Sequence, residues 1–120
     1  MEIKTHEELE TWKNNVIAEI LSKKDQRKIY TICLPRRHGK TRMLLQLAEV
    51  LKPVHVITTG ERTIKQFEPF ITPLKSSVLL IDEVEHIAKE VDYSNYSLVV
   101  QTAANPQPNS INFEIEIKIK

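Results

Sequence analysis

The chain has 120 residues, which is the size of one domain with a single hydrophobic core. Its 17 basic residues against 16 acidic ones give a net charge of +1 and exclude a protein-wide nucleic-acid footprint, so any contact with DNA has to be local. The single cysteine, Cys33, excludes a disulfide framework, and no apolar run is long enough to span a membrane. With the charged start of the chain, these features favour a cytoplasmic protein (in the host cytoplasm if it is viral) without a membrane partner.

The first predicted element is an amphipathic helix over residues 6–22. Thr5 and Glu8 form a capping box at its start. Apolar residues then recur at helical spacing, at Leu9, Trp12, Val16 and Ile20. We expect this stripe to pack on a sheet, and the alternative is a platform for a partner helix. The polar connector that follows, residues 22–28, fits a solvated turn better than a DNA contact.

The most informative segment is an apolar run over residues 28–34 that continues into a basic loop. The loop reads Pro35-Arg36-Arg37-His38-Gly39-Lys40-Thr41 and opens a predicted amphipathic helix over residues 40–51. The order strand, loop, helix is that of a phosphate-binding P-loop, where N–H groups and the helix dipole attract an anion. We therefore expect nucleotide contacts from one continuous stretch, namely Pro35, Arg36, Arg37, His38, Gly39, Lys40, Thr41 and Arg42.

Within this loop, Lys40 is the expected cation for the β- and γ-phosphates, and Thr41 supplies a hydroxyl ligand for Mg²⁺. The first glycine of the usual motif is missing, because Leu34 stands in its place. A Gly-Lys-Thr string is also short enough to occur by chance. The alternative is therefore a small α/β protein with a chance turn of this sequence.

Further elements follow the P-loop at the spacing of an α/β domain. They are a strand at 54–59, a short helix at 61–67, a strand at 78–81, a helix at 84–91 and a strand at 97–103. The last segment, residues 111–120, alternates strictly between apolar and charged residues, which predicts a strand with one wet face. We expect it at a sheet margin, and the alternative is a pairing surface for another chain.

The strand at 78–81 ends in two carboxylates, Asp82 and Glu83, and has the form of a Walker B strand. A buried parallel strand has little reason to end in paired acids except at the carboxyl edge of the sheet, where ligands bind. Asp82 is expected to hold Mg²⁺, directly or through water, and Glu83 to polarise the attacking water. The alternative for Glu83 is an acid that stabilises the start of the next helix. This acid pair is the pattern of the ASCE branch of P-loop proteins.

Arg36 and Arg37 stand where an ordinary Walker loop has small residues. A guanidinium at this place can sit beside the β- and γ-phosphates and stabilise the charge of the transition state in cis. The alternative is that one or both point to solvent or pair with Asp82 or Glu83. His38 fits a loop-packing or solvent-facing residue better than a catalyst.

These motifs together resemble the ATPase domain of the large terminase subunits, the DNA-packaging ATPases of tailed phages. The resemblance is specific at Pro35–Thr41, moderate at Leu79–Glu83 and weak at Leu98–Pro106, which is similar to the family's coupling motif. It implies ATP and Mg²⁺ as cofactors, catalytic roles for Lys40 and Glu83, and a cis arginine finger at Arg36. It also implies double-stranded DNA or a DNA-handling protein as partner, with a homo-oligomer left open.

The chain departs from that family in two respects. It is several times shorter, with no room for the nuclease domain, and the adenine-binding motif upstream of the P-loop has no clear counterpart. We therefore expect a single P-loop NTPase-like α/β domain over residues 1–120, with a small, mainly parallel sheet of about five strands flanked by helices. Its core spans residues 28–106, after the N-terminal helix and before the C-terminal strand.

The expected function is ATP binding and hydrolysis in phage DNA packaging or other DNA handling. A non-hydrolysing P-loop regulator that works through protein contacts is the alternative, because the domain is small and the first loop glycine is missing. A small nucleotide kinase is disfavoured, since such an enzyme needs an arginine-rich lid after the Walker B strand and residues 84–120 contain no arginine.

Overall fold

A computed structural model describes all 120 residues of the chain. The strands are β1 (Glu2–Ile3), β2 (Lys28–Cys33), β3 (His55–Ile57), β4 (Val78–Ile81), β5 (Leu98–Ala103), β6 (Ile111–Glu114) and β7 (Glu116–Ile117). The helices are α1 (His6–Ser22), α2 (Lys40–Leu51) and α3 (Glu61–Phe67), with two short 3₁₀ turns, η1 (Glu68–Phe70) and η2 (Val84–His86). The fold is therefore an α/β domain.

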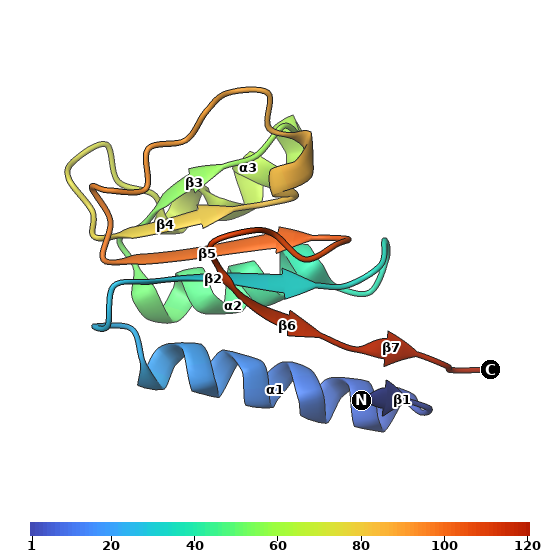
Figure 1. Ribbon diagram of the computed structural model, residues 1–120. Helices are drawn as coiled ribbons and strands as arrows, with labels where there is room; N and C mark the ends of the chain where they lie inside the picture. The colour runs from blue at the N-terminus through green and yellow to red at the C-terminus, as the bar shows by residue number, and fades with distance from the viewer.

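Five strands form one sheet in the order β3-β4-β5-β2-β6, and every neighbouring pair in it is parallel (Figure 1). The mainly parallel five-stranded sheet predicted from the sequence is thus confirmed. In a parallel sheet all carboxyl ends lie at one edge. The loop after β2, the acids after β4 and the turn after β5 consequently meet at that edge.

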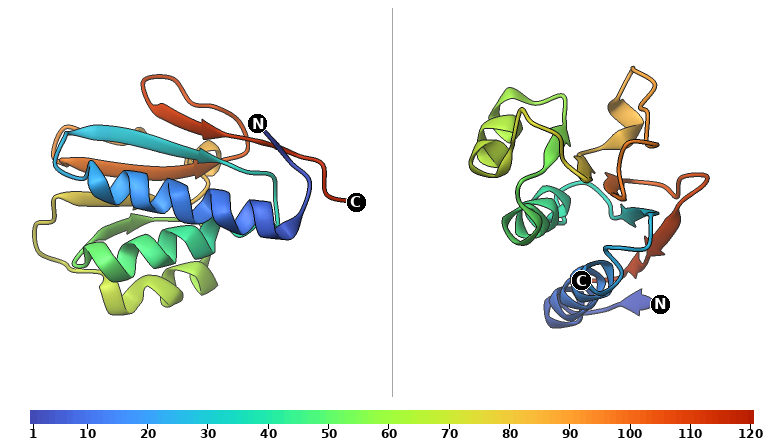
Figure 2. Two further views of the ribbon diagram at one scale, coloured as in Figure 1. Left: turned by 90° about the horizontal axis from the view of Figure 1, so that it is seen from below. Right: turned by 90° about the vertical axis from the view of Figure 1, so that its left-hand side faces the viewer.

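The three α-helices cover one face of this sheet (Figure 2). A core cluster of 17 buried residues lies between them and the strands, including Leu9, Val16 and Ile20 from α1. The stripe on the first helix is thus confirmed as core. The opposite face is covered only by the segment between β4 and β5, whose side chains pack on Leu79, Ile81 and Val99.

The three α-helices begin and end at the predicted residues, 6–22, 40–51 and 61–67. The predicted capping box is present, because Thr5 Oγ1 accepts from the Glu8 N–H at 3.1 Å and donates to Glu8 Oε1 at 3.3 Å. The strands are shorter than predicted at their ends: β2 stops at Cys33, and β3 covers only His55–Ile57.

The helix predicted over residues 84–91 is wrong. Only the 3₁₀ turn η2 forms, and Ile87 then turns to extended backbone. The apolar residues of this segment instead cover the second face of the sheet as an irregular chain. Ile87, Val91 and Tyr96 pack there against the small cluster around Leu79. Tertiary packing therefore overrides the local pattern.

The C-terminal segment lies at the sheet margin, as predicted, but it is not one strand. β6 pairs with β2 in the main sheet, whereas β7 pairs with the short N-terminal β1, which was not predicted. The alternation does place one apolar face inward, since Phe113 stacks on Tyr30 with ring centroids 5.7 Å apart. Residues 115, 117 and 119 also pack against the main core, while Ile111 stays 41% exposed.

Cys33 is buried in β2, and this burial raises the pKa of its thiol to about 11, so the thiol is protonated and unreactive at neutral pH. None of the helices is both long enough and apolar enough to cross a membrane.

Candidate functional site

The loop between β2 and α2 presents a row of free backbone N–H groups. From Arg36 to Arg42, no backbone N–H donates a hydrogen bond to another group of the protein. Gly39 is the N-cap of α2 with φ of 86°, a left-handed conformation that glycine adopts without a steric penalty. Free N–H groups at the positive end of a helix form a site for an anion.

Lys40 is the first residue of α2, and its side chain lies inside this site. It is only 7% exposed, yet its ammonium makes neither a hydrogen bond nor an ion pair within the protein. The stem of the side chain is buried, while the ammonium itself reaches solvent. An anion from outside the chain could pair with this ammonium.

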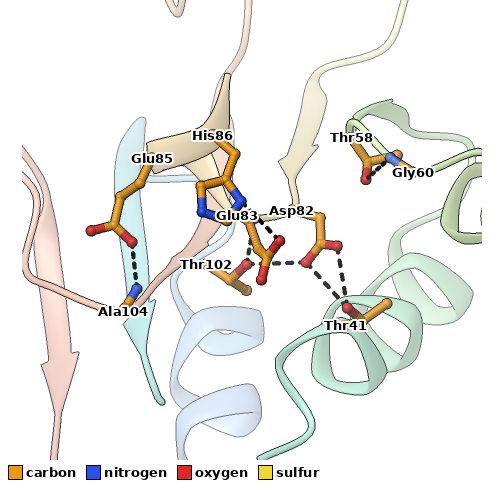
Figure 3. A network of polar contacts seen from close by, with 9 residues as sticks. All are labelled: Thr41, Thr58, Gly60, Asp82, Glu83, Glu85, His86, Thr102 and Ala104. Carbon is orange, nitrogen blue, oxygen red and sulfur yellow. Dashed lines mark hydrogen bonds and ion pairs between the residues drawn. The ribbon is translucent and has the colours of Figure 1, made fainter. Parts of the chain in front are cut away.

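Asp82, Thr41 and Thr102 form a buried polar contact between three elements (Figure 3). Thr41 Oγ1 lies 3.3 and 3.2 Å from the two carboxylate oxygens of Asp82, and Thr102 Oγ1 donates to Oδ1 at 3.1 Å. Burial raises the pKa of Asp82, and the hydrogen bonds from Thr102 and Thr41 oppose this effect. The predicted pair of metal ligands, Thr41 and Asp82, is thus brought together.

Glu83 follows Asp82 with a backbone φ of 54°, which is uncommon for a residue other than glycine. Its N–H donates to Thr102 Oγ1 at 2.8 Å, and its Oε2 lies 3.2 Å from Nδ1 of His86. The Glu83 side chain accepts no hydrogen bond from an N–H of η2. The alternative role, an acid that caps the next helical turn, therefore has no supporting contact. Residues held in strained backbone conformations are concentrated at functional sites.

Glu85 is a site residue that sequence reasoning missed. Its carboxylate accepts from the Ala104 N–H at 2.6 Å and from Asn105 Nδ2 at 3.1 Å. The bond from Ala104 is the main reason why the pKa of Glu85 lies below its ordinary value. Glu85 thereby ties the segment after β4 to the turn after β5 (Figure 3). The available signal was a third acid so close to the Asp-Glu pair.

A cavity of about 180 Å³ opens between these elements, lined by Arg36, Lys40, Glu83, Glu85, His86 and Ala104. Its lining includes the three predicted catalytic residues, namely the cations Arg36 and Lys40 and the proposed base Glu83. A whole nucleotide usually fills a larger space, so this cavity has the size for the terminal phosphates only. The nucleoside would lie on the open surface beside it.

The other predicted contact residues lie around the cavity rather than in it. Arg37 is exposed and has a φ of 64°, and it does not line the cavity. The His38 ring turns back on the loop, with Nδ1 2.9 Å from the Arg36 carbonyl oxygen. Pro35 and Arg42 are exposed. Of the two unusual arginines, the structure therefore brings Arg36 alone to the cavity.

The chain contains no group of three or more His, Cys, Asp or Glu side chains that could hold a metal ion by themselves. Thr41 and Asp82 offer a hydroxyl and one carboxylate, which are hard oxygen donors suited to Mg²⁺. Mg²⁺ is commonly held in this way, by one or two carboxylates together with the phosphates of a substrate. The donor set therefore fits Mg²⁺ that arrives with a nucleotide.

The site thus combines free N–H donors, a cation without an anionic partner, a hydroxyl–carboxylate pair and a second acid at the carboxyl edge of a parallel sheet. Such an arrangement can bind phosphate and stabilise charge that develops on it. In comparisons with known proteins, no family model, no curated protein and no solved structure matches the chain.

Proposed function

We propose that this chain binds ATP with Mg²⁺ at the carboxyl edge of its sheet and hydrolyses the terminal phosphate. The observation that carries the proposal is Lys40 at the start of α2, whose stem is buried while its ammonium faces the cavity without an anionic partner. It stands beside backbone N–H groups that have no acceptor within the protein. A bound polyphosphate would pair with the ammonium and accept from these N–H groups.

Each side chain then has a distinct role. Lys40 binds the terminal phosphates, while Thr41 and Asp82 hold Mg²⁺, which neutralises phosphate charge when it is bound. Glu83 orients and deprotonates the attacking water. Arg36 reaches the same cavity and stabilises negative charge as it develops on the γ-phosphate.

The terminase-like assignment draws support from the strand order. β5 lies between the strand that leads into the P-loop and the strand that ends in Asp82. Thr102 near its end contacts Asp82, and the following turn is held by Glu85. This is a suitable position for a coupling motif that responds to the γ-phosphate. We therefore propose that the turnover of ATP serves DNA handling, with DNA packaging as the specific case.

One observation favours the alternative of a non-hydrolysing regulator. Glu83 Oε2 lies 3.2 Å from His86 Nδ1, and the two side chains form an ion pair when His86 is protonated. A carboxylate held in such a pair is a weaker base. A protein that binds ATP but does not release Glu83 from His86 would hold the nucleotide without turnover. Binding and turnover must therefore be measured separately.

The test is ATP turnover with Mg²⁺, with and without double-stranded DNA, beside equilibrium binding of ATP to the same preparation. Lys40→Ala is the control in every arm. Turnover that rises with DNA and is lost in Lys40→Ala supports the motor-like function. Tight binding without turnover selects the regulator. Binding that is equal in the wild type and in Lys40→Ala rejects the proposed site.

A further inference from the structure

Lys13 of α1 lies against the loop that precedes α2, although 26 positions of sequence separate it from Gly39 in the printed chain. A Cβ atom placed on Gly39 would lie 2.8 Å from Lys13 Nζ and 3.7 Å from its Cε. The Lys13 side chain is only 13% exposed. The Lys13 ammonium therefore lies next to the backbone of the candidate phosphate loop at Gly39.

This ammonium is poorly compensated. Its single ion pair joins Nζ to Glu10 Oε1 at 3.5 Å, and the Glu10 side chain is 69% exposed. No hydrogen bond of Lys13 accompanies this pair. Lys23 on the same helix is the contrasting case, since its Nζ donates to Glu19 Oε1 at 3.1 Å and both side chains are about half exposed. The stem of Lys13 is largely buried, whereas its ammonium reaches solvent and has only this weak partner in the protein.

The position is also unfavourable for a cation in the absence of a ligand. Gly39 caps the N-terminus of α2, which carries the positive end of the helix dipole. Lys40 and Arg36 add two further cations in the same loop region. A third cation here lowers the stability of the free protein, but it raises the attraction for a polyanion.

We propose that Lys13 is a further phosphate-binding residue, contributed by α1 from the Gly39 side of the loop, and that it contacts the polyphosphate of the bound nucleotide. This inference depends on the proposed ATP binding. It makes the N-terminal helix part of the site rather than only a cover for the sheet. A side chain at position 39 would be strained by the left-handed backbone there and would also displace this ammonium.

The test compares Lys13→Met with Lys23→Met by equilibrium binding of Mg-ATP and Mg-ADP. Methionine keeps an unbranched apolar stem and removes the charge, and Lys23 is the matched control because it also pairs with a glutamate of α1. A charge-assisted hydrogen bond of ordinary strength predicts an affinity for Mg-ATP that is about tenfold to a hundredfold weaker in Lys13→Met. Lys23→Met should bind as the wild type does, and Lys13→Arg should recover most of the loss.

Thermal unfolding without nucleotide separates binding from structure. Lys13→Met should unfold at the wild-type temperature or above it, because a poorly paired cation beside other cations has been removed. An affinity equal to that of the wild type, or an equal loss in Lys23→Met, overturns the inference. Lys13→Gln repeats the comparison if Lys13→Met does not fold.

The inference and the proposed function fail in different ways. If the wild type binds Mg-ATP and Lys40→Ala abolishes that binding while Lys13→Met leaves it unchanged, only the role of Lys13 is rejected. If the wild type binds no Mg-ATP, both are rejected.

Discussion

The polar groups at the two ends of the sheet differ in whether they are hydrogen-bonded within the protein. At the amino end, the ring of His55 is hydrogen-bonded at both nitrogens, to Tyr96 Oη at 2.8 Å and to the Leu74 carbonyl at 2.7 Å. Ser76 Oγ donates there to the Pro53 carbonyl at 2.8 Å. At the carboxyl end, Lys40 and the N–H groups of the loop before it have no partner.

We propose from this difference that the carboxyl end is the ligand site. The cavity beside His55, of about 390 Å³, is larger than the cavity of about 180 Å³ beside Lys40, so the proposal does not rest on volume. Polar groups that bond within the chain stabilise the fold, whereas a cation and N–H donors without partners beside an open cavity can bind another molecule. The one buried side-chain atom without a hydrogen-bond partner, Tyr30 Oη, lies in β2 and does not line that cavity.

The largest expected effect comes from Lys40→Met, which keeps much of the apolar stem but removes the charge. Turnover of Mg-ATP and its binding should both be lost, while the unfolding temperature of the free protein stays equal or rises. His55→Ala at the other end should do the reverse, with a loss of about 1–3 kcal/mol in stability and no change in ATP affinity. Paired binding and unfolding assays check both, and a strongly destabilised Lys40→Met would make this lysine a structural residue.

Arg36 and Arg37 allow a comparison within the carboxyl end itself. Only Arg36 lines the cavity, so Arg36→Ala should lower turnover by about a thousandfold, as the loss of an arginine finger does, with a much smaller change in affinity. Arg37→Ala should change turnover far less. Single-turnover kinetics beside equilibrium binding measure the two effects. An equal loss of affinity in both variants would reduce the pair to a general attraction for anions.

Glu83→Gln tests the proposed base and should have the next largest effect. The amide keeps the size of the side chain but cannot take a proton, so hydrolysis should fall by at least about a hundredfold while ATP still binds. Turnover and binding are measured on the same preparation. Unchanged turnover in Glu83→Gln would remove Glu83 from the chemistry and favour the regulator.

The smallest expected effect concerns the stability of the free protein and its dependence on pH. Burial raises the pKa of Asp82 above its ordinary 3.8, so the folded protein holds this proton more tightly than the unfolded chain does. The contribution of Asp82 to stability is therefore present below that ordinary value and is lost as the pH rises through the raised pKa. Asp82→Asn, which keeps an acceptor for Thr41 and Thr102, should be more stable than the wild type at pH 7 by up to about 1 kcal/mol.

This advantage should shrink as the pH is lowered toward the ordinary carboxyl range. Thermal unfolding of both proteins at pH 4 and pH 7, without nucleotide or metal, measures it. An Asp82→Asn protein that is clearly less stable than the wild type at pH 7 would mean that the carboxylate stabilises the fold rather than serving as a metal ligand.

Local sequence signals were enough for the parts of the fold that depend on local physics. The helix stripes, the capping box at Thr5 and Glu8, and the buried strand before Asp82 were all readable as patterns. The segment after Glu83 was not, because Val84, Ile87 and Val91 have helical spacing but cover the second face of the sheet. Only the tertiary structure decides between these two arrangements.

The residues of the candidate site likewise fall into those with a local sequence signal and those without one. The residues of the loop and the two acids were found because each motif is continuous in sequence. Glu85, His86 and Lys13 were missed in these roles because their contacts join elements that are distant in the chain or depend on a turn that was read as a helix. A residue brought to a site by another element carries no local signature.

In the proposed complex, the free N–H groups of the loop before α2, and not the amino end of the sheet, receive the phosphates. Two-dimensional ¹H–¹⁵N spectra of the protein during titration with Mg-ATP report on each of these N–H groups. The largest changes in amide shift should fall between Arg36 and Arg42, with little change at His55, Lys75 and Tyr96. Changes confined to the amino end, or no saturable change at the loop, would contradict this proposal.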